Sequence, residues 1–345
     1  MLDRTFVDEL SCGLHIEQVV NVRDNSYVRV SGVSDCRRKI GYRLTGFAEG
    51  EREQPNWSHA LSIFDIGHGI HLRLQQRLSN AGPLKWVDAD PVIDHHGTYG
   101  LVGNCEIPLV NNEYKVRGHC DALSRPLKKK LVDFNGERVE IVVPTEEDDP
   151  EGTRYIIDIK SITGRERLVS TDDPLTGKVK SCEIKPSSFE KLQDPKPEHI
   201  AQASIYSWMT TQKDFTTDRI KKPLEKMPDV MIIYVAKDID PGYYGKFPGE
   251  YTNPKGLLNI PYKVFTQPVD IDHVNVLLRK IQGVWKSLEA GKLPPRDYHY
   301  TAERPAWACV DCPFRAKCYE SEGWFENESL EIPSLLAYKL STLNQ

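Results

Sequence analysis

Hydrophobic positions recur at helical spacing in several parts of the chain. The clearest example lies between residues 58 and 80, where apolar side chains fall on one face of a predicted helix. These are Leu61, Phe64, Ile70, Leu74 and Leu78. Further helices are expected over about 197–212 and 270–290. A short basic helix after Ser31 is expected to hold Cys36 in its first turn, because good N-cap residues precede it.

Other segments are typical of strands. The candidates are residues 100–109, 113–123, 155–162 and 230–235. Residues 127–152 predict a hairpin-like insertion, since Asn135-Gly136 is a strong signal for a tight turn. Residues 163–197 are rich in Ser, Thr, Pro and Lys without periodicity, which predicts a long loop or mobile lid. Together these elements predict an α/β fold with a mixed central sheet flanked by helices.

Composition limits the class of protein. Hydrophobic residues make up 39% of the 345 residues and charged residues 28%, which is ordinary for a globular chain. The net charge of -5 gives no general attraction to nucleic acid, so any DNA binding depends on local basic patches. The sequence contains no apolar run of about 18 residues and no signal peptide at Met1. We therefore expect a cytoplasmic protein with no membrane attachment.

Four of the eight cysteines have the spacing of metal ligands. Cys309, Cys312 and Cys318 form a C-x2-C-x5-C set, and Cys36 could complete it from the N-terminal region. Four thiolates suit either Zn2+ or an iron-sulfur cluster, and spacing does not separate the two. Because both ends of the chain must meet at such a site, we favour one domain over residues 31–318. A leading segment over residues 1–30 precedes it, and a tail over residues 319–345 follows.

A second group of candidate ligands is rich in oxygen. Asp158 and Lys160 alternate along a predicted strand, so they share one face, while Ile157 and Ile159 point to the other. If Asp121 arrives from a neighbouring strand, two carboxylates could hold Mg2+ or Mn2+ beside the lysine. These parts suit phosphodiester hydrolysis, although a surface salt bridge also explains an isolated Asp-x-Lys.

The order of the candidate residues carries a family resemblance. Along the chain the series is Gly67-x3-His71, Glu106, Gly118-His-Cys-Asp121, Asp158-Ile-Lys160, Gln202-x3-Tyr206 and the three C-terminal cysteines. This series resembles the RecB-like branch of the PD-(D/E)XK nuclease superfamily. Within that branch it resembles the iron-sulfur members, such as CRISPR-associated RecB-like exonucleases, the AddB nuclease domain and phage exonucleases.

The resemblance implies a restriction-endonuclease-like core and a metal-dependent DNA exonuclease. Single-stranded or resected DNA ends would be its substrate, in recombination, repair or phage replication in a bacterial or phage-infected cell. We expect a helicase or recombination protein as a partner, and a helicase motor would be a separate chain because no Walker A motif is present. A structure-specific or prespacer-trimming endonuclease, and a non-catalytic DNA-binding scaffold, remain alternatives.

The resemblance also implies roles for single residues. His71, Asp121 and Asp158 would bind Mg2+ or Mn2+, with Glu106 as an additional ligand, and Lys160 would be the catalytic lysine. Gln202 and Tyr206, one helical turn apart, would support the site or touch DNA. His68 lacks the Gly-x3-His position and His119 could only flank the metal. The four spaced cysteines would hold a structural [4Fe-4S] cluster, with Zn2+ as the alternative and the other cysteines buried.

Two features leave the picture open. Asp158 lies 37 residues after Asp121, farther than the short hairpin usual in the family, so the strand register is undecided. The insertion at 127–152 would accommodate the distance. Basic residues near Cys36 and in the 163–197 segment could follow DNA phosphates, although a solvated face explains them equally. These are Arg37, Arg38, Lys39, Arg43, Lys178 and Lys180.

Overall fold

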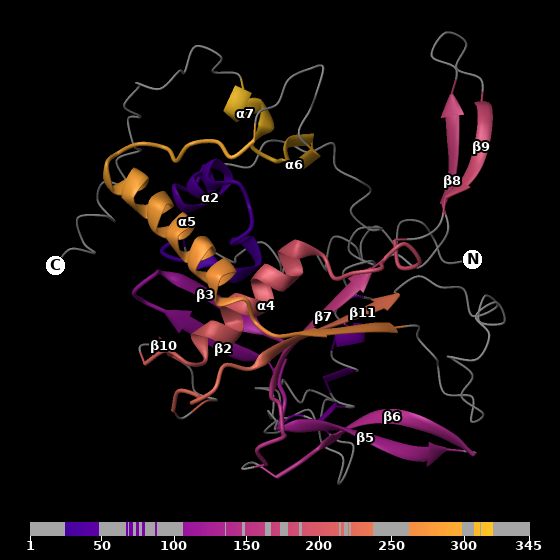
Figure 1. Ribbon diagram of the computed structural model, residues 1–345. Helices are drawn as coiled ribbons and strands as arrows, with labels where there is room; N and C mark the ends of the chain where they lie inside the picture. The colour runs from indigo at the N-terminus through magenta and orange to yellow at the C-terminus, as the bar shows by residue number, and fades with distance from the viewer. Residues whose placement is uncertain are drawn as a thin grey trace, which may run out of the picture. The chain divides into compact units, whose positions relative to one another are not determined.

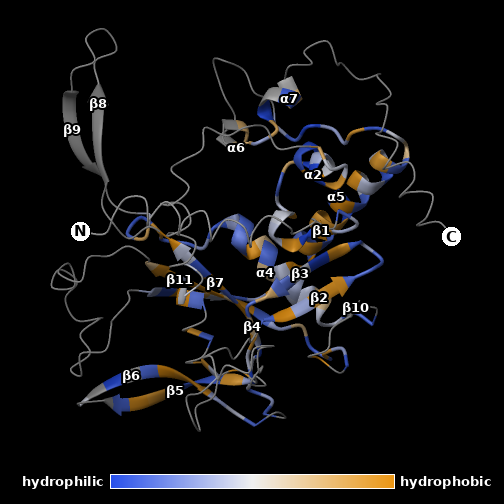
Figure 2. Ribbon diagram, turned by 180° about the vertical axis from the view of Figure 1, so that it is seen from behind, coloured by the Kyte–Doolittle hydropathy of each residue, from blue (hydrophilic) through white to orange (hydrophobic). Residues whose placement is uncertain are grey.

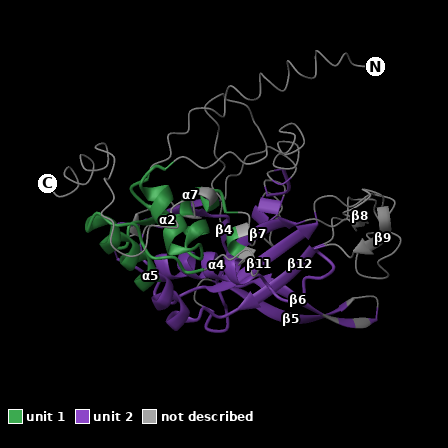
Figure 3. Cartoon of the chain, turned by 90° about the horizontal axis from the view of Figure 1, so that it is seen from above, with its two compact units in different colours: residues 1–64, 114–116, 278–345 green, residues 65–113, 117–277 purple. Residues whose placement is uncertain are grey.

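The computed structural model describes most of the central part of the chain (Figure 1). The described residues are 25–47, 67, 69–71, 74–75, 78–79, 87, 106–134, 136–146, 149–162, 167–172, 179–185, 188–213, 215–216, 220, 222–236, 262–298, 307–310 and 312–319. The chain divides into two compact units (Figure 3). The first comprises residues 1–64, 114–116 and 278–345, and the second comprises 65–113 and 117–277.

The second unit is built around a mixed sheet with the strand order β12-β11-β7-β4. Its strands are β4 (Ala122–Leu123), β7 (Tyr155–Ile162), β11 (Asp229–Ala236) and β12 (Tyr262–Gln267). β7 and β11 run parallel, whereas the two outer pairs are antiparallel. The sequence prediction of an α/β protein with a mixed sheet is confirmed. Strand β11 is apolar on both faces because a central strand of this kind is covered on both sides.

The two faces of β7 pack differently. Ile157 and Ile159 join Met231 and Ile233 in a buried core, together with Ile70 from the predicted helix at 58–80. The described residues between 67 and 79 are helical, and residues 58–66 lie outside the described part. The opposite face of β7 and β11 contacts α4 (Pro197–Met209). Asp158 and Lys160 therefore face α4, as the alternation of the strand predicts.

A second sheet has the order β1-β3-β2-β10. It contains β1 (Val28–Arg29), β2 (Ile107–Asn111), β3 (Val116–Cys120) and β10 (Phe215–Thr216). The predicted strand at 113–123 is divided at Asp121, so that β3 belongs to this sheet and β4 to the mixed sheet. Of the strand predicted at 100–109, residues 100–105 lie outside the described part. The division brings Asp121 to a change of direction in the backbone rather than to the middle of a strand.

Two hairpins complete the strands. β5 (Leu127–Phe134) pairs with β6 (Glu137–Pro144), which confirms the predicted insertion. Gly136 in its turn has a φ of 84°, a left-handed conformation that glycine adopts readily. β8 (Arg167–Asp172) pairs with β9 (Val179–Lys185), so the predicted long loop over 163–197 is wrong where these two strands lie, and its mobility as a lid stays a prediction. Antiparallel backbone pairing does not require hydrophobic alternation, so periodicity did not reveal this hairpin.

Short helices lie towards both ends of the described part of the chain. After the 3-10 turn η1 (Val30–Gly32), helix α2 (Arg37–Leu44) begins one residue beyond Cys36. Cys36 is therefore the N-cap with an extended ψ of 136° and does not lie in the first turn, which corrects the prediction. Towards the C-terminus lie α6 (Trp307–Val310) and α7 (Arg315–Tyr319).

The long helices follow their predicted hydrophobic patterns. α5 (Ile271–Glu289) buries a stripe of apolar residues, visible as orange bands on its ribbon in Figure 2. α4 begins with Pro197 in its first turn and ends at Met209, three residues before the predicted boundary. Among the described helices, none combines the length and apolar character that crossing a membrane requires.

Candidate functional site

Asp121 and Asp158 meet across the β4–β7 pair. The antiparallel register places Ala122 opposite Ile157, which continues to Asp121 opposite Asp158. Asp121 Oδ2 accepts a hydrogen bond of 2.6 Å from the backbone N–H of Ile159. The expected arrival of Asp121 from a neighbouring strand is confirmed. The same pairing settles the strand register that the sequence left undecided. The β5–β6 hairpin accounts for most of the residues between Asp121 and Asp158.

Asp158 is the most unusual carboxylate of the site. Its side chain is 2% exposed, and Oδ1 accepts a hydrogen bond of 3.0 Å from Lys160 Nζ. Oδ2 is buried and has no hydrogen-bond partner among the described residues. Burial raises the pKa of Asp158 to about 7; the charge of Lys160 opposes this rise, and that of Asp121 adds to it. A buried oxygen without a partner is costly, so it is a candidate position for a cation.

Lys160 is held between a carboxylate and an amide. Its Nζ donates to Asp158 Oδ1 and, over 3.1 Å, to Gln202 Oε1 from α4. One turn later on the same face, the buried Tyr206 forms a side-chain hydrogen bond with Gln202. Gln202 and Tyr206 thus lie together beside Lys160, as their spacing predicts. Their contact with DNA stays a prediction.

Gly118 gives Tyr206 the room that it needs. A Cβ atom at residue 118 would lie 2.5 Å from Tyr206 Oη and 2.9 Å from its ring. Contacts this short force either the tyrosine or strand β3 to move. The glycine in the sequence series is therefore explained by the close approach of α4 to β3.

We expect Gly118→Ala to lower the free energy of unfolding by about 1–3 kcal/mol, because the new methyl group overpacks the site. Gly283→Ala is the matched control, since its Cβ would meet nothing within 4 Å in the interior of α5. That change should stabilise the protein by about 0.5–1 kcal/mol. Urea unfolding of both variants measures the difference. Equal effects would contradict the packing argument.

His71 and Gln75 approach Asp121 from the helical segment. His71 Nδ1 lies 3.6 Å from Asp121 Oδ2, and the histidine side chain is 25% exposed. Gln75, one turn later and buried, donates a hydrogen bond of 2.9 Å to the backbone carbonyl of Asp121. Sequence reasoning missed Gln75, although its spacing of four residues from His71 was a usable signal. Of the rival histidines, His68 lies outside the described residues and His119 is exposed on β3.

Tyr234 and His199 form a second group beside Lys160 that sequence reasoning missed. Tyr234 lies next to Lys160 in the parallel register of β11 and β7. Its Oη accepts the backbone N–H of Lys196 at 2.9 Å, and it lies 2.7 Å from His199 Nδ1. A hydrogen bond therefore joins the Tyr234 hydroxyl to His199 Nδ1.

The charge state of His199 follows from its surroundings. Burial lowers the pKa of His199 to about 3, and the positive charges of Lys160 and Lys196 act in the same direction. The imidazole is therefore neutral at physiological pH and adds no second cation beside Lys160. The spacing of His199, Gln202 and Tyr206 along one helical face could have identified it.

Glu106 stands immediately before β2. Its charge contributes to the raised pKa of the buried Cys120 thiol, after burial itself and the charges of Asp121 and Asp158. Glu106 is therefore close enough to Cys120 to act on it electrostatically, and its role as a ligand stays a prediction. Cys120 is buried, as expected for a structural cysteine.

The four spaced cysteines belong to the first unit. Cys36, Cys309, Cys312 and Cys318 are free thiols. Burial raises the pKa of Cys312, and negative charge on Cys309 and Cys36 raises it further. Burial and the charge of Cys36 raise the pKa of Cys318, whereas Arg296 and Arg38 lower it. The thiols therefore lie within electrostatic reach of one another, with arginines nearby that favour thiolates.

The two groups of candidate ligands differ in the kind of metal that their donor atoms suit. Among the described residues, no group of three or more His, Cys, Asp or Glu side chains is placed so that it could hold a metal ion. The donor chemistry nevertheless fits. Carboxylate and imidazole groups with the unpartnered Asp158 Oδ2 suit Mg2+ or Mn2+, and four thiols suit a softer centre. Zn2+ and [4Fe-4S] are not distinguished by these contacts.

The basic residues around Cys36 have partners within the protein. Arg37 pairs with Asp297, and Arg38 donates to the carbonyl of Pro294. Lys39 and Arg43 both pair with Asp35. These four side chains are thus used in part to hold α2, and DNA contact stays a prediction. Lys178 lies outside the described residues, and Lys180 lies in β9.

The ionisation of Asp158 predicts a pH effect on stability without metal. Its pKa is about 7 when folded, against about 3.8 for an ordinary aspartate. Between these values the folded state keeps a proton that the unfolded state releases, so its contribution to the free energy of unfolding falls as pH rises. We expect Asp158→Asn to gain on the order of 2–4 kcal/mol relative to wild type between pH 4.5 and pH 8.

Urea unfolding in EDTA measures the free energy of unfolding of Asp158→Asn and of wild type at both pH values. The difference between the two proteins is then compared between pH 4.5 and pH 8, so that titrating groups unaffected by the substitution cancel. An unchanged difference between Asp158→Asn and wild type would show that Asp158 is ionised throughout.

The chain matches no protein-family model and no curated protein. Solved structures that it resembles include the crystal structure of SSO0001, with 13% sequence identity and a TM-score of 0.33. That match covers 91% of this chain and 96% of the other. A similarity at this level supports no argument about fold or function.

Proposed function

We propose that this protein is a Mg2+- or Mn2+-dependent DNA nuclease with a RecB-like PD-(D/E)XK core. Its preferred action would be exonucleolytic, on single-stranded or resected DNA ends in recombination, repair or phage replication. The observation that carries the proposal is the meeting of Asp121 and Asp158 across β4 and β7, with Lys160 beside them. The residue types and their order match those of the family that the sequence resembles.

A structural ion pair is the competing explanation. Buried pairs of this kind usually satisfy the remaining lone pairs of the carboxylate, because an unsatisfied buried oxygen is costly. Asp158 satisfies only Oδ1, and its Oδ2 lacks a partner among the described residues. A second carboxylate, Asp121, lies opposite it across the strand pair and raises its pKa. Two close carboxylates with a free oxygen favour a cation site over a structural pair.

The chemistry follows from the positions of these groups. A bound divalent cation would polarise the phosphate and lower the pKa of water. Asp121 and Asp158 would hold it, with His71 completing the set. Lys160, held by Asp158 Oδ1 and Gln202 Oε1, would orient the nucleophile or stabilise negative charge that develops on the phosphate. Tyr206 would hold Gln202 in place, and the neutral His199 would add no positive charge beside Lys160.

The cysteine set would serve a structural purpose in this protein. A [4Fe-4S] cluster, or Zn2+ as the alternative, would tie the helix after Cys36 to the C-terminal cysteines. The partners of the protein would be DNA and a helicase or recombination protein. A cytoplasmic location in a bacterial or phage-infected cell is part of the same proposal.

The test uses single-stranded and double-stranded DNA labelled at either end, with Mn2+ or Mg2+, and EDTA as control. Closed single-stranded circles are included because an exonuclease cannot begin on them. We expect metal-dependent degradation of linear DNA and intact circles. Cleavage of circles or of flaps would favour the endonuclease alternative. DNA binding without cleavage in either metal would favour a scaffold and overturn the proposal.

A further inference from the structure

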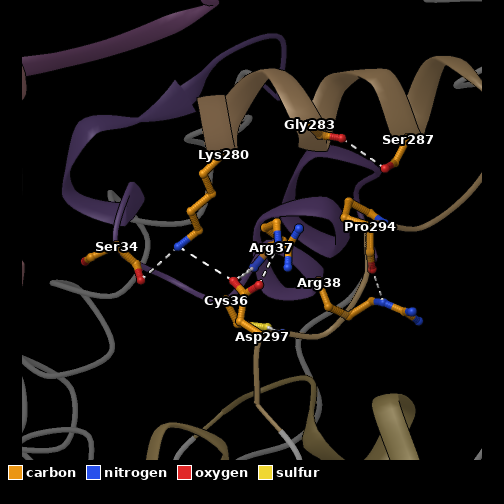
Figure 4. Close-up of polar contacts among 9 residues, drawn as sticks. All are labelled: Ser34, Cys36, Arg37, Arg38, Lys280, Gly283, Ser287, Pro294 and Asp297. Carbon is orange, nitrogen blue, oxygen red and sulfur yellow. Dashed lines mark hydrogen bonds and ion pairs between the residues drawn. The ribbon is translucent and has the colours of Figure 1, made fainter. Parts of the chain in front are cut away.

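The segment Pro294–Asp297 contacts the protein next to both ends of the cysteine set. We call this segment the strap. Arg38, two residues after Cys36, donates to the carbonyl of Pro294 (Figure 4). Arg296 donates to the carbonyl of Cys318. The backbone N–H of Asp297 donates to Cys36 Sγ at 3.4 Å. The strap thereby joins the surroundings of Cys36 and Cys318 through contacts of the chain itself.

The carboxylate of Asp297 binds Arg37, the residue that follows Cys36. As N-cap of α2, Cys36 provides no side-chain hydrogen bond to the helix. Asp297 Oδ2 replaces this cap by accepting the backbone N–H of Arg37 at 2.8 Å. Asp297 also pairs with the Arg37 guanidinium (Figure 4). The residue on each side of the Cys36–Arg37 peptide is thus bound by the same aspartate.

Lys280 of α5 contacts both Asp297 and the segment that precedes Cys36. Its Nζ lies 3.7 Å from Asp297 Oδ2 and donates to the carbonyl of Ser34 at 3.2 Å. Burial lowers the pKa of Lys280, and the charge of Asp297 opposes this effect. The loop that leads into Cys36 is therefore tied to α5 and to the strap at once (Figure 4).

A helix cap alone would explain only part of these contacts. Capping requires an acceptor for Arg37 N, which the carboxylate supplies. It does not require the N–H of Asp297 to point at a sulfur. Hydrogen bonds to ligand sulfurs orient thiolates and tune the metal that they bind, and they are a regular feature of iron-sulfur and zinc sites.

We propose that Asp297 is the positioning residue that holds Cys36 as a thiolate ligand of a soft metal centre shared with Cys309, Cys312 and Cys318. The inference rests on the proposed four-cysteine site and is independent of DNA cleavage. It explains how a single cysteine far from the other three can be ordered at the entrance of a helix before a metal is bound.

The test measures how firmly the full-length, anaerobically purified protein retains its metal. Iron, sulfide and zinc per chain are determined first, and a chelator titration then gives the concentration at which half of the metal is removed. Asp297→Ala should release metal at a roughly 10- to 100-fold lower chelator concentration. Asp297→Asn should restore most of the retention, since its amide oxygen can still accept from Arg37 N.

Asp35→Ala is the matched control. Asp35 precedes Cys36 by one residue and pairs with Lys39 and Arg43 on the same helix. Its removal should loosen α2 without changing the hydrogen bond to Cys36 Sγ, so metal retention should remain close to wild type. If Asp297→Ala does not fold, Asp297→Glu, which displaces the carboxylate by one methylene, takes its place in the comparison below.

A double-mutant cycle with Cys36→Ser separates positioning from a general structural effect. If Asp297 acts through Cys36, Asp297→Ala should cause no further loss in the Cys36→Ser background. An equal loss in both backgrounds would overturn the proposal, as would wild-type retention in Asp297→Ala. A wild-type protein that binds neither iron nor zinc would also overturn it, while the DNA assay would still decide the nuclease proposal separately.

Discussion

Replacing Asp158 by alanine should abolish metal-dependent DNA cleavage. We expect the rate to fall by about three orders of magnitude or more, because even residues that only support metal ligands are worth about 10- to 100-fold. The fold should survive, since the change removes a buried oxygen that has no partner among the described residues, and Lys160 keeps its hydrogen bond to Gln202 when it loses Asp158 Oδ1. The initial rate on end-labelled DNA in Mn2+ measures the loss, and circular dichroism confirms folding.

Asp158→Asn and Asp149→Asn sharpen this experiment. The first keeps the shape of the side chain and removes its charge, so it should be as inactive as alanine. The second removes a carboxylate that pairs with Lys128 beside the β5–β6 hairpin, and it should cleave DNA at close to the wild-type rate. Wild-type activity in Asp158→Ala would show that the assignment of the site is wrong.

Loss of the Lys160 ammonium should slow the chemical step without comparable loss of DNA binding. The lysine is held by Asp158 and Gln202, so it is fixed before any substrate arrives. A group of this kind acts mainly on charge that develops in the transition state, and its removal costs on the order of 10²–10³ in rate. Lys160→Met is the preferred variant because it keeps most of the aliphatic stem.

Lys263→Met on β12 is the matched control for Lys160. Its Nζ donates to the backbone carbonyl of Leu192, and it should cleave at nearly the wild-type rate. Single-turnover rates and DNA dissociation constants are measured for both variants. If Lys160→Met lost binding and rate by the same factor, Lys160 would be an anchor for phosphate rather than a catalytic group.

Elements with strong local patterns were predicted well from the sequence. Strand β7 and helices α4 and α5 lie within a few residues of their expected bounds, because apolar spacing along one segment reflects burial of one face. The shared face of Asp158 and Lys160 follows from strand alternation alone. The β5–β6 hairpin was recognisable because an Asn-Gly turn has its own conformational preference.

Elements without a local hydrophobic pattern were predicted less well. Hairpin β8–β9 was taken for a loop, since its pairing depends on the partner strand rather than on periodicity. Cys36 was placed one residue too far into α2 because the helix is capped by Asp297. That aspartate lies 260 residues from Arg37 in sequence, so no local rule could identify it.

The candidate sites show the same division between local and long-range information. The sequence by itself determined the kinds of residue, their order and the face of β7 on which the carboxylate and lysine lie. Only the tertiary structure decided the β4–β7 register, the burial of Asp158 and the contacts of Gln75, His199 and Asp297. Hydrogen bonds and desolvation depend on which distant segments meet, whereas side-chain periodicity depends on neighbours along the chain.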